Sequence, residues 1–149
     1  TDLISGQAMI EDIKRRNGLE YSIITTDKRA GQKSEEIIGY IAAVEDETDE
    51  GDACVYLEDI AVLPEAQGQK IGWNMLKSFI EKLKAKASKN NKPILLDMHL
   101  RENSQRFMEH HRDELERMGV KLLESTLMPN YYDEGEDALY QVYQIENND

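Results

Sequence analysis

The stretch IAVLPEAQGQKIGWNML, from Ile60 to Leu76, decides the fold more than any other part of the sequence. An apolar run typical of a strand ends at Leu63-Pro64, because proline cannot extend a central strand. The turn QGQKIG, from Gln67 to Gly72, then leads into a helix. A helix N-terminus presents unpaired N–H groups and a positive dipole end, and glycine lets an anion approach the backbone closely. The stretch therefore predicts a strand–turn–helix unit that binds a phosphate group.

The charge around this turn favours the same interpretation. Between Gln67 and Lys92 there are seven lysines against one acid, Glu81, a local balance of +6 in a chain of net charge −12. The plainer alternative is a strand–helix connection whose glycines only cap and pack, beside a solvated lysine face. The spacing matches neither the P-loop motif nor the glycine fingerprint of dinucleotide-binding folds.

Outward from this unit, hydrophobic periodicity and turn residues predict a mixed α/β fold. Early hairpin-paired strands followed by a crossover helix imply a mixed sheet. The predicted elements are a helix over 3–16, strands over 19–26, 36–45 and 53–62, a helix over 72–90, a strand over 94–100, a helix over 103–118, and strands over 120–127 and 138–145.

Length and composition limit the class of protein. A chain of 149 residues predicts one domain over 1–149, and 40% apolar residues are too many for a disordered acidic tail. The single cysteine, Cys54, excludes a disulfide framework, and His99, His110 and His111 lack the spacing of metal ligands. No run approaches the ~18 apolar residues of a membrane span. We expect a cytoplasmic protein without metal, membrane or nucleic-acid partners, whose acidity suits a cationic substrate, although solubility alone could explain the charge.

The turn resembles the acyl-CoA-binding motif of the GNAT N-acetyltransferase superfamily, [Q/R]-x-x-G-x-[G/A] after a strand. Gln67 and Gly72 match its ends, and Lys70 stands where the central glycine is usual. The resemblance implies acetyl-CoA as co-substrate, with the strand pairing with its pantetheine arm, the turn holding its pyrophosphate, and an asparagine after the next strand in contact. The residues implied are Ile60, Ala61, Val62, Gln67, Gly68, Gln69, Lys70, Ile71, Gly72, Trp73 and Asn103.

Two further segments carry the resemblance. Tyr131-Tyr132 with the following Gly-Glu-Asp-Ala run resembles protein N-terminal acetyltransferases, and Leu57-Glu58-Asp59 is similar to spermidine/spermine N-acetyltransferase. Over Leu19 to Ile145 the resemblance implies a mostly antiparallel mixed sheet flanked by helices. The family's first strand and first helix are expected to be missing, because the chain begins near its second helix, either as a short variant or as a trimmed sequence.

Acetyl transfer to an amine requires a base for the amine proton, an oxyanion stabiliser and an acid for the leaving thiolate. The resemblance makes Glu58 the first candidate base, acting through water; the alternative is an ordinary acid near a strand end. Asp97 is the second candidate. Its apolar neighbours predict burial, and a buried unpaired carboxylate is costly, so Asp97 is either paired or functional.

The acid and the substrate contacts are harder to assign. Many family members carry a tyrosine seven positions after the asparagine, where this chain has His110; the alternative is an exposed, inert histidine. By resemblance Tyr131 and Tyr132 line a peptide entrance, and Tyr132 could protonate the thiolate; the alternative is two half-buried loop aromatics. Asp59, on the strand face opposite Glu58, is expected to contact substrate.

Three remaining residues are interpreted as structural, without a role in the site. Tyr140 and Tyr143 alternate with apolar positions and are interpreted as ordinary strand residues. Cys54 begins a strand with no visible base partner and is interpreted as a buried, inert thiol.

The predicted function is direct transfer of an acetyl group from acetyl-CoA to a primary amine. The acceptor is a peptide or protein N-terminus, a lysine, or a small polyamine-like cation. The alternative from another class is a degenerate acyl-CoA-binding or protein-interaction module, suggested by Lys70, the absent usual tyrosine and the missing first strand. A plain structural domain with coincidental glycines is a further rival, and a homodimer is left open.

Overall fold

The computed structural model describes residues 23–27, 36–47, 53–62, 68 and 70–147. The sheet has the strand order β1-β2-β3-β4-β6-β5. The printed pairings, β1 with β2, β4 with β6 and β5 with β6, are antiparallel. Helix α2 joins the neighbouring strands β3 and β4, the kind of crossover that parallel strands need. The elements are β1 (Ile23–Asp27), β2 (Glu36–Glu47), β3 (Ala53–Val62), α2 (Ile71–Asn90), β4 (Ile94–Leu100), α3 (Glu102–His110), α4 (Arg112–Arg117), β5 (Val120–Met128) and β6 (Ala138–Ile145).

The sequence predicts most of these bounds. The strands over 53–62, 94–100 and 138–145 are confirmed to the residue, and the other ends that can be compared shift by one or two residues. The predicted start of the first strand, at Leu19, lies outside the described residues. One prediction is wrong: the single helix over 103–118 breaks at His111 into α3 and α4. There the N–H of His111 donates to the carbonyl of Met108, three residues back, which tightens the last turn of α3 and ends it. The helix predicted over 3–16 lies outside the described residues.

The described residues group into two units, one formed by residues up to 45 together with 57–82, the other by 46–56 together with 83–149. In the first, the buried positions of α2 recur every three or four residues, so one stripe of the helix is apolar. The stripe comprises Met75, Leu76, Phe79 and Ile80, all at most 2% exposed. Gly39 of β2 allows close packing here, because a Cβ would lie 3.0 Å from Met75 Cε and 3.1 Å from the Ala61 carbonyl oxygen.

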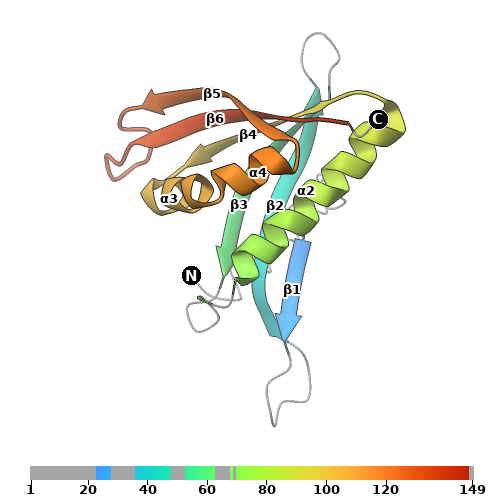
Figure 1. Ribbon diagram of the computed structural model, residues 1–149. Helices are drawn as coiled ribbons and strands as arrows, with labels where there is room; N and C mark the ends of the chain where they lie inside the picture. Colours follow the sequence, from blue (N-terminus) through green and yellow to red (C-terminus); the bar gives the residue numbers. More distant parts are fainter. Residues whose placement is uncertain (1–22, 28–35, 48–52, 63–67, 69, 148–149) are drawn as a thin grey trace. The chain divides into compact units, whose positions relative to one another are not determined.

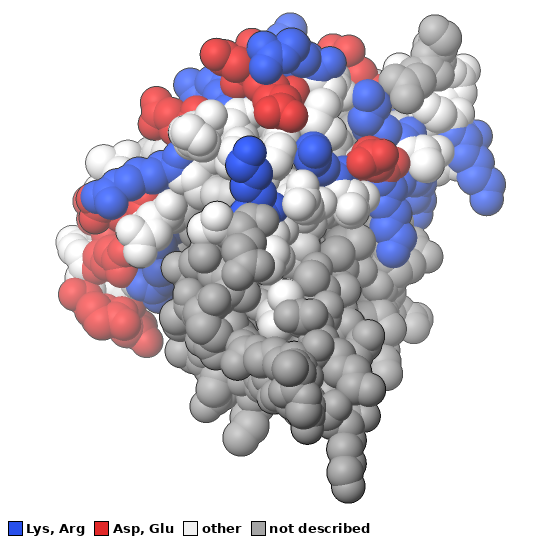
Figure 2. All heavy atoms as spheres, turned by 60° about the horizontal axis from the view of Figure 1, so that its bottom comes forward, with Lys and Arg blue, Asp and Glu red and all other residues white. Residues whose placement is uncertain are grey.

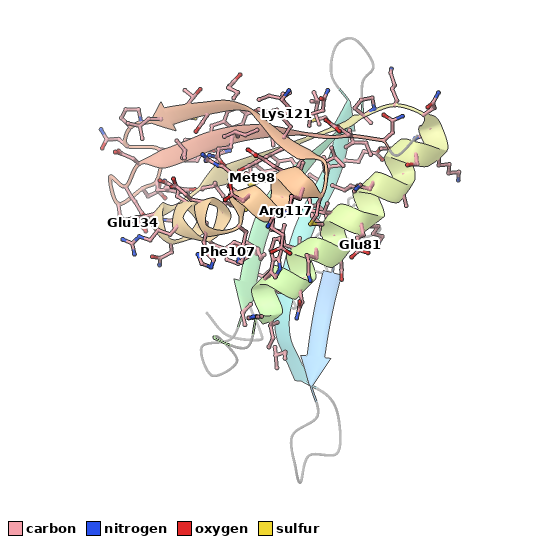
Figure 3. The ribbon with its side chains drawn as sticks, viewed as in Figure 1. Glu81, Met98, Phe107, Arg117, Lys121 and Glu134 are labelled. Carbon is pink, nitrogen blue, oxygen red and sulfur yellow. The ribbon has the colours of Figure 1, made fainter. Side chains whose placement is uncertain are left out.

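In the second unit, β4 alternates between a buried and a half-exposed face, as a strand covered on one side does. Its even positions, Ile94 to Leu100, are buried, whereas Asp97 and His99 are half-exposed. Helices α3 and α4 lie over one face of β4, β5 and β6 (Figure 1), and each buries one apolar side chain, Met108 and Leu115. Figure 3 marks Met98 on β4 and Phe107 on α3. Asp97 and His99 therefore belong to the face of β4 opposite its buried residues.

None of the helices in the described part of the chain combines the length and the apolar character that a membrane span requires.

Candidate functional site

Two described residues of the turn before α2, Gly68 and Lys70, have left-handed backbone. Gly68 has φ +86° and Lys70 has φ +60°, and both are exposed. The N–H of Asn74 donates to the Lys70 carbonyl at 2.9 Å, so Lys70 is the residue that immediately precedes α2 and accepts its first hydrogen bond. No acidic residue occupies the first turn of α2, so the positive end of its dipole is not neutralised by its own helix. Gln67 and Gln69 lie outside the described residues and remain predictions.

Lys70 adopts the left-handed conformation that normally favours glycine, which costs a side-chain-bearing residue roughly 1–2 kcal/mol. We expect Lys70→Gly to be more stable than Lys70→Ala by about 1 kcal/mol in urea denaturation, because only glycine relieves the strain. Both variants lose the ammonium group, so we expect the same severalfold rise in the Kd for acetyl-CoA by calorimetry. Tighter binding by Lys70→Gly than by the unmodified chain would contradict a role for this cation.

The lysines predicted to surround the turn have different roles. Lys70 is exposed, and Lys77 Nζ lies 5.7 Å from the centroid of the Trp73 ring, at the start of α2. Lys84 instead donates to the carbonyl of Met118 at 2.6 Å. Figure 2 shows basic and acidic side chains interspersed over the described part of one face. The cations nearest the turn in the chain are therefore Lys70 and Lys77.

At the end of β3, Asp59 is held by a tyrosine of the first unit. Its Oδ2 accepts a hydrogen bond of 2.7 Å from the hydroxyl of Tyr40, which is 8% exposed. Burial, and then Asp59, raise the pKa of Tyr40, so the phenol stays neutral and keeps donating. Glu58 points to the opposite strand face and is half-exposed. The roles predicted for both acids, and for the half-buried Ile60, Ala61 and Val62, remain predictions.

In the second unit, polar and aromatic side chains meet around His99. Its Nδ1 is 2.8 Å from the hydroxyl oxygen of Tyr56. The imidazole is stacked on Tyr131, with ring centroids 4.5 Å apart and planes 10° apart, and it is tilted against Tyr140 at 4.8 Å. Burial lowers the pKa of His99 below 6.5, and the nearby charge of Asp97 offsets part of that effect. The lowered pKa favours the neutral imidazole, in which one ring nitrogen can accept a proton.

The prediction that Asp97 is buried is wrong, because it lies on the half-exposed face of β4; of the two alternatives left open, paired or functional, the structure shows that it is paired. Its Oδ2 accepts from the Tyr140 hydroxyl at 2.9 Å and its Oδ1 accepts from the Cys54 thiol at 3.4 Å. The interpretation of Tyr140 as an ordinary strand residue is wrong, because it contacts both Asp97 and His99. The interpretation of Cys54 as a buried thiol without a base partner is also wrong, because Cys54 is half-exposed and its thiol contacts the Asp97 carboxylate. Burial, and then Asp97, raise the pKa of Tyr140, so this phenol holds Asp97 rather than giving up a proton.

The loop between β5 and β6 holds the two tyrosines predicted to contact substrate. Tyr131 is 45% exposed and meets Tyr132 edge to face, with centroids 5.0 Å apart. The guanidinium carbon of Arg101 lies 3.7 Å from the centroid of the Tyr132 ring, and Arg101 Nη1 lies 2.6 Å from Glu136 Oε2. Figure 3 marks Glu134 in the same loop. The tyrosine pair is thus anchored at His99 by one ring and at Arg101 by the other.

Two other predicted residues lie on α3. Asn103 is exposed in its first turn, and His110 is exposed at its last residue, with its ring 4.8 Å from that of His111. The described contacts therefore join Asp97 to His99 through Tyr140, and His99 to Arg101 through Tyr131 and Tyr132. They place His110 beside His111 instead. Among the described residues, no three potential ligands form a metal site.

His99 and Tyr56 are the site residues that sequence reasoning missed. The available signal was alternation along β4, which places His99 on the same strand face as Asp97. What identifies the pair is the contact between positions 43 residues apart in the chain, and no local pattern predicts it.

Known structures share this fold. The NatC complex bound to Gag peptide and CoA matches with TM-score 0.65 and 14% identity, covering 95% of this chain and 79% of that chain. Arabidopsis thaliana Naa50 in complex with the bisubstrate analogue CoA-Ac-MVNAL matches with TM-score 0.55 and 18% identity, over 83% and 72%. The ribosomal-protein-S18-alanine N-acetyltransferase from Escherichia coli matches with TM-score 0.55 and 20% identity, over 93% and 79%.

Comparison with curated protein sequences returns no match. The family model described as the acetyltransferase (GNAT) family matches residues 7–112, which include β1 to β4, the glycine turn and the whole of α3. That span exceeds half of the chain, and the fold agrees with it. The chain therefore belongs to the GNAT acetyltransferase family.

Proposed function

We propose that this protein is an N-acetyltransferase that moves an acetyl group from acetyl-CoA to the α-amine of a peptide or protein N-terminus. The observation that carries the proposal is the His99 imidazole, with Nδ1 in hydrogen-bond contact with the Tyr56 hydroxyl and its ring stacked on the exposed ring of Tyr131. Tyr56 lies on β3, the strand that leads directly into the glycine turn before α2.

The residues present fit acetyl-CoA, since the turn has left-handed backbone at two positions and the helix behind it has no acid in its first turn. When bound, acetyl-CoA supplies the acetyl thioester. Gly68, Lys70 and the first N–H groups of α2 would hold its pyrophosphate, and β3 residues Ile60 to Val62 would pair with its pantetheine arm.

The chemistry that falls to the protein is mainly proton transfer. A peptide α-amine has a pKa near ~8 and is mostly protonated at neutral pH, so it must lose a proton before its nitrogen can attack the thioester carbonyl. The Tyr56–His99 pair can accept that proton. In one tautomer Nδ1–H donates to the phenol oxygen and Nε2 is the free acceptor; in the other the phenol oxygen takes the proton as the phenol passes its own to Nδ1. After the attack the nitrogen releases a second proton to solvent as the amide forms, the C–S bond breaks, and the leaving thiolate takes up one proton, for which Tyr132 remains the predicted donor.

A peptide is favoured over a polyamine by the aromatic surface at the hairpin. Tyr131 stacks on the imidazole, and Tyr132 packs edge to face against Tyr131. These rings offer an apolar surface for the first side chain of a peptide, next to the reacting α-amine. The similar structures of NatC and Naa50 were determined with a peptide and with a peptide-containing analogue. A small cationic amine is the competing acceptor, suggested by the acidity of the chain.

The test is an acetyl-CoA titration by calorimetry followed by a thiol-release assay on three acceptors. These are a peptide with a free N-terminus, the same peptide with its N-terminus blocked and an internal lysine retained, and spermidine. We expect binding of acetyl-CoA and turnover with the first acceptor alone. Turnover with spermidine alone would assign a small-amine acetyltransferase, and binding without turnover on any acceptor would leave an acyl-CoA-binding module.

A further inference from the structure

Arg101 connects the strand that carries His99 with the loop that carries the two tyrosines. It follows directly after β4 and is the N-cap residue of α3, with extended backbone at φ −76° and ψ 167°. Because side chains two positions apart on extended backbone point to the same side, Arg101 continues the face of His99. Its guanidinium lies over the Tyr132 ring at 3.7 Å and reaches Glu136 Oε2 at 2.6 Å.

The β5–β6 loop, which Arg101 contacts, is held together by its own hydrogen bonds. The N–H of Tyr132 donates to the carbonyl of Glu136 at 3.0 Å, and the N–H of Gly135 donates to the carbonyl of Tyr132 at 2.9 Å. At the loop's entrance the N–H of Asn130 donates to Asp137 Oδ1 at 2.9 Å. These hydrogen bonds tie the residues of the loop to one another. A contact that fixes Tyr132 and Glu136 therefore also fixes the backbone between them and the adjacent Tyr131.

We propose that Arg101 is a positioning residue of the amine site, an inference that rests on the proposed function. Its guanidinium holds the β5–β6 loop in the position in which Tyr131 stacks on His99, and it acts through that loop without touching the reacting atoms. Arginine suits both contacts, since its planar guanidinium stacks on a ring and forms a directed bond to a carboxylate, whereas lysine provides only the charge.

A surface ion pair alone would not support this role. The Arg101 and Glu136 side chains are 47% and 41% exposed, and exposed pairs contribute little to global stability. What distinguishes Arg101 is the ring contact added to the ion pair. Arg106 provides the matched control, because it pairs with Glu102 at 2.7 Å on the neighbouring helix, where the structure describes no ring contact for it.

The first test uses NMR of the protein without substrate, comparing Arg101→Ala with Arg106→Ala. The groups that face His99 are Tyr56 from β3, Asp97 on its own strand, Tyr140 from β6 and Tyr131 from the loop. In Arg101→Ala we expect the His99 ring protons to lose the ring-current shift from Tyr131, and the pKa of His99 to rise toward its ordinary value as water reaches the ring. In Arg106→Ala both should stay as in the unmodified chain.

The second test is kinetic. In Arg101→Ala we expect the KM for the peptide to rise about tenfold, because the loop must now be ordered at the cost of binding energy, with kcat changed less than about threefold. The Kd for acetyl-CoA should not change, and Arg101→Lys should recover part of the loss. His99 signals in Arg101→Ala identical to those in Arg106→Ala would overturn the proposal. If the unmodified chain transfers no acetyl group, the proposed function fails, and the NMR comparison still decides the role of Arg101.

Discussion

Replacing His99 by glutamine is expected to lower kcat for a peptide α-amine roughly 10²- to 10⁴-fold, the usual contribution of a positioned base. Glutamine can still bond to the Tyr56 hydroxyl, but its amide cannot take a proton at neutral pH. We therefore expect the melting temperature and the Kd for acetyl-CoA to stay near their original values. Steady-state kinetics with a saturating peptide measures the effect, and Tyr56→Phe should reproduce a smaller part of it.

The pH dependence gives an independent check on His99. Burial keeps the pKa of its imidazole below 6.5, so the neutral, proton-accepting form persists down to that range. In the unmodified chain kcat should fall as the pH is lowered through the depressed pKa of His99, at lower pH than for a free imidazole. In His99→Gln that limb should be lost, and the residual rate should instead rise with pH toward the α-amine pKa of about 8.

Glu58→Gln separates this base from the one that the sequence favours. Glu58 lies on the same strand, two residues after Tyr56. Its replacement by glutamine removes one candidate proton acceptor, as His99→Gln removes the other. If His99 is the base, Glu58→Gln should retain kcat within about tenfold. A larger loss in Glu58→Gln than in His99→Gln would return the role of base to Glu58.

Replacing Phe79 by alanine is expected to give the largest loss of stability in the first unit. Phe79 is fully buried in the apolar stripe of α2, the helix whose N-terminus forms the expected pyrophosphate seat. Truncation of a buried phenylalanine costs about 3–5 kcal/mol, which for a chain of this size lowers the melting temperature by roughly 6–20 °C. Differential scanning calorimetry measures the shift.

The neighbouring Ser78→Ala serves as the control, because Ser78 is exposed on the same helix and its substitution should change stability by less than about 0.5 kcal/mol. Acetyl-CoA at 100 times its Kd should stabilise both proteins by about 2.7 kcal/mol, provided that Phe79→Ala keeps the turn intact. If Phe79→Ala melted at the same temperature as Ser78→Ala, the apolar stripe of α2 would not be part of the core of the first unit.

The strand–turn–helix unit could be predicted because its signals are local. Leu63-Pro64 predicts the end of β3, which lies at Val62; the glycines predict the turn, and the apolar spacing of α2 shows in a few residues. Lys70 illustrates the limit of a motif, since the backbone there keeps the left-handed conformation with a side chain present. The break at His111 was not predictable, because the residues on both sides are equally compatible with one continuous helix.

The centre of the candidate site could not be predicted, because its contacts join distant parts of the chain. Tyr56 and His99 are 43 residues apart, as are Cys54 and Asp97, and Tyr140 meets His99 only through the register of β4 with β6. Each of these residues has an ordinary interpretation on its own strand. Periodicity assigns a side chain to a face, whereas strand pairing decides which side chains share it.

The most direct test of the central claim is a mass-spectrometric assay on one peptide with a free N-terminus and an internal lysine. The peptide is incubated with acetyl-CoA and either the unmodified chain or His99→Gln, and fragmentation locates the acetyl group. We expect acetylation of the α-amine alone by the unmodified chain, and its near-complete loss in His99→Gln at unchanged acetyl-CoA affinity. Acetylation of the lysine alone, or equal α-amine acetylation by both proteins, would contradict it.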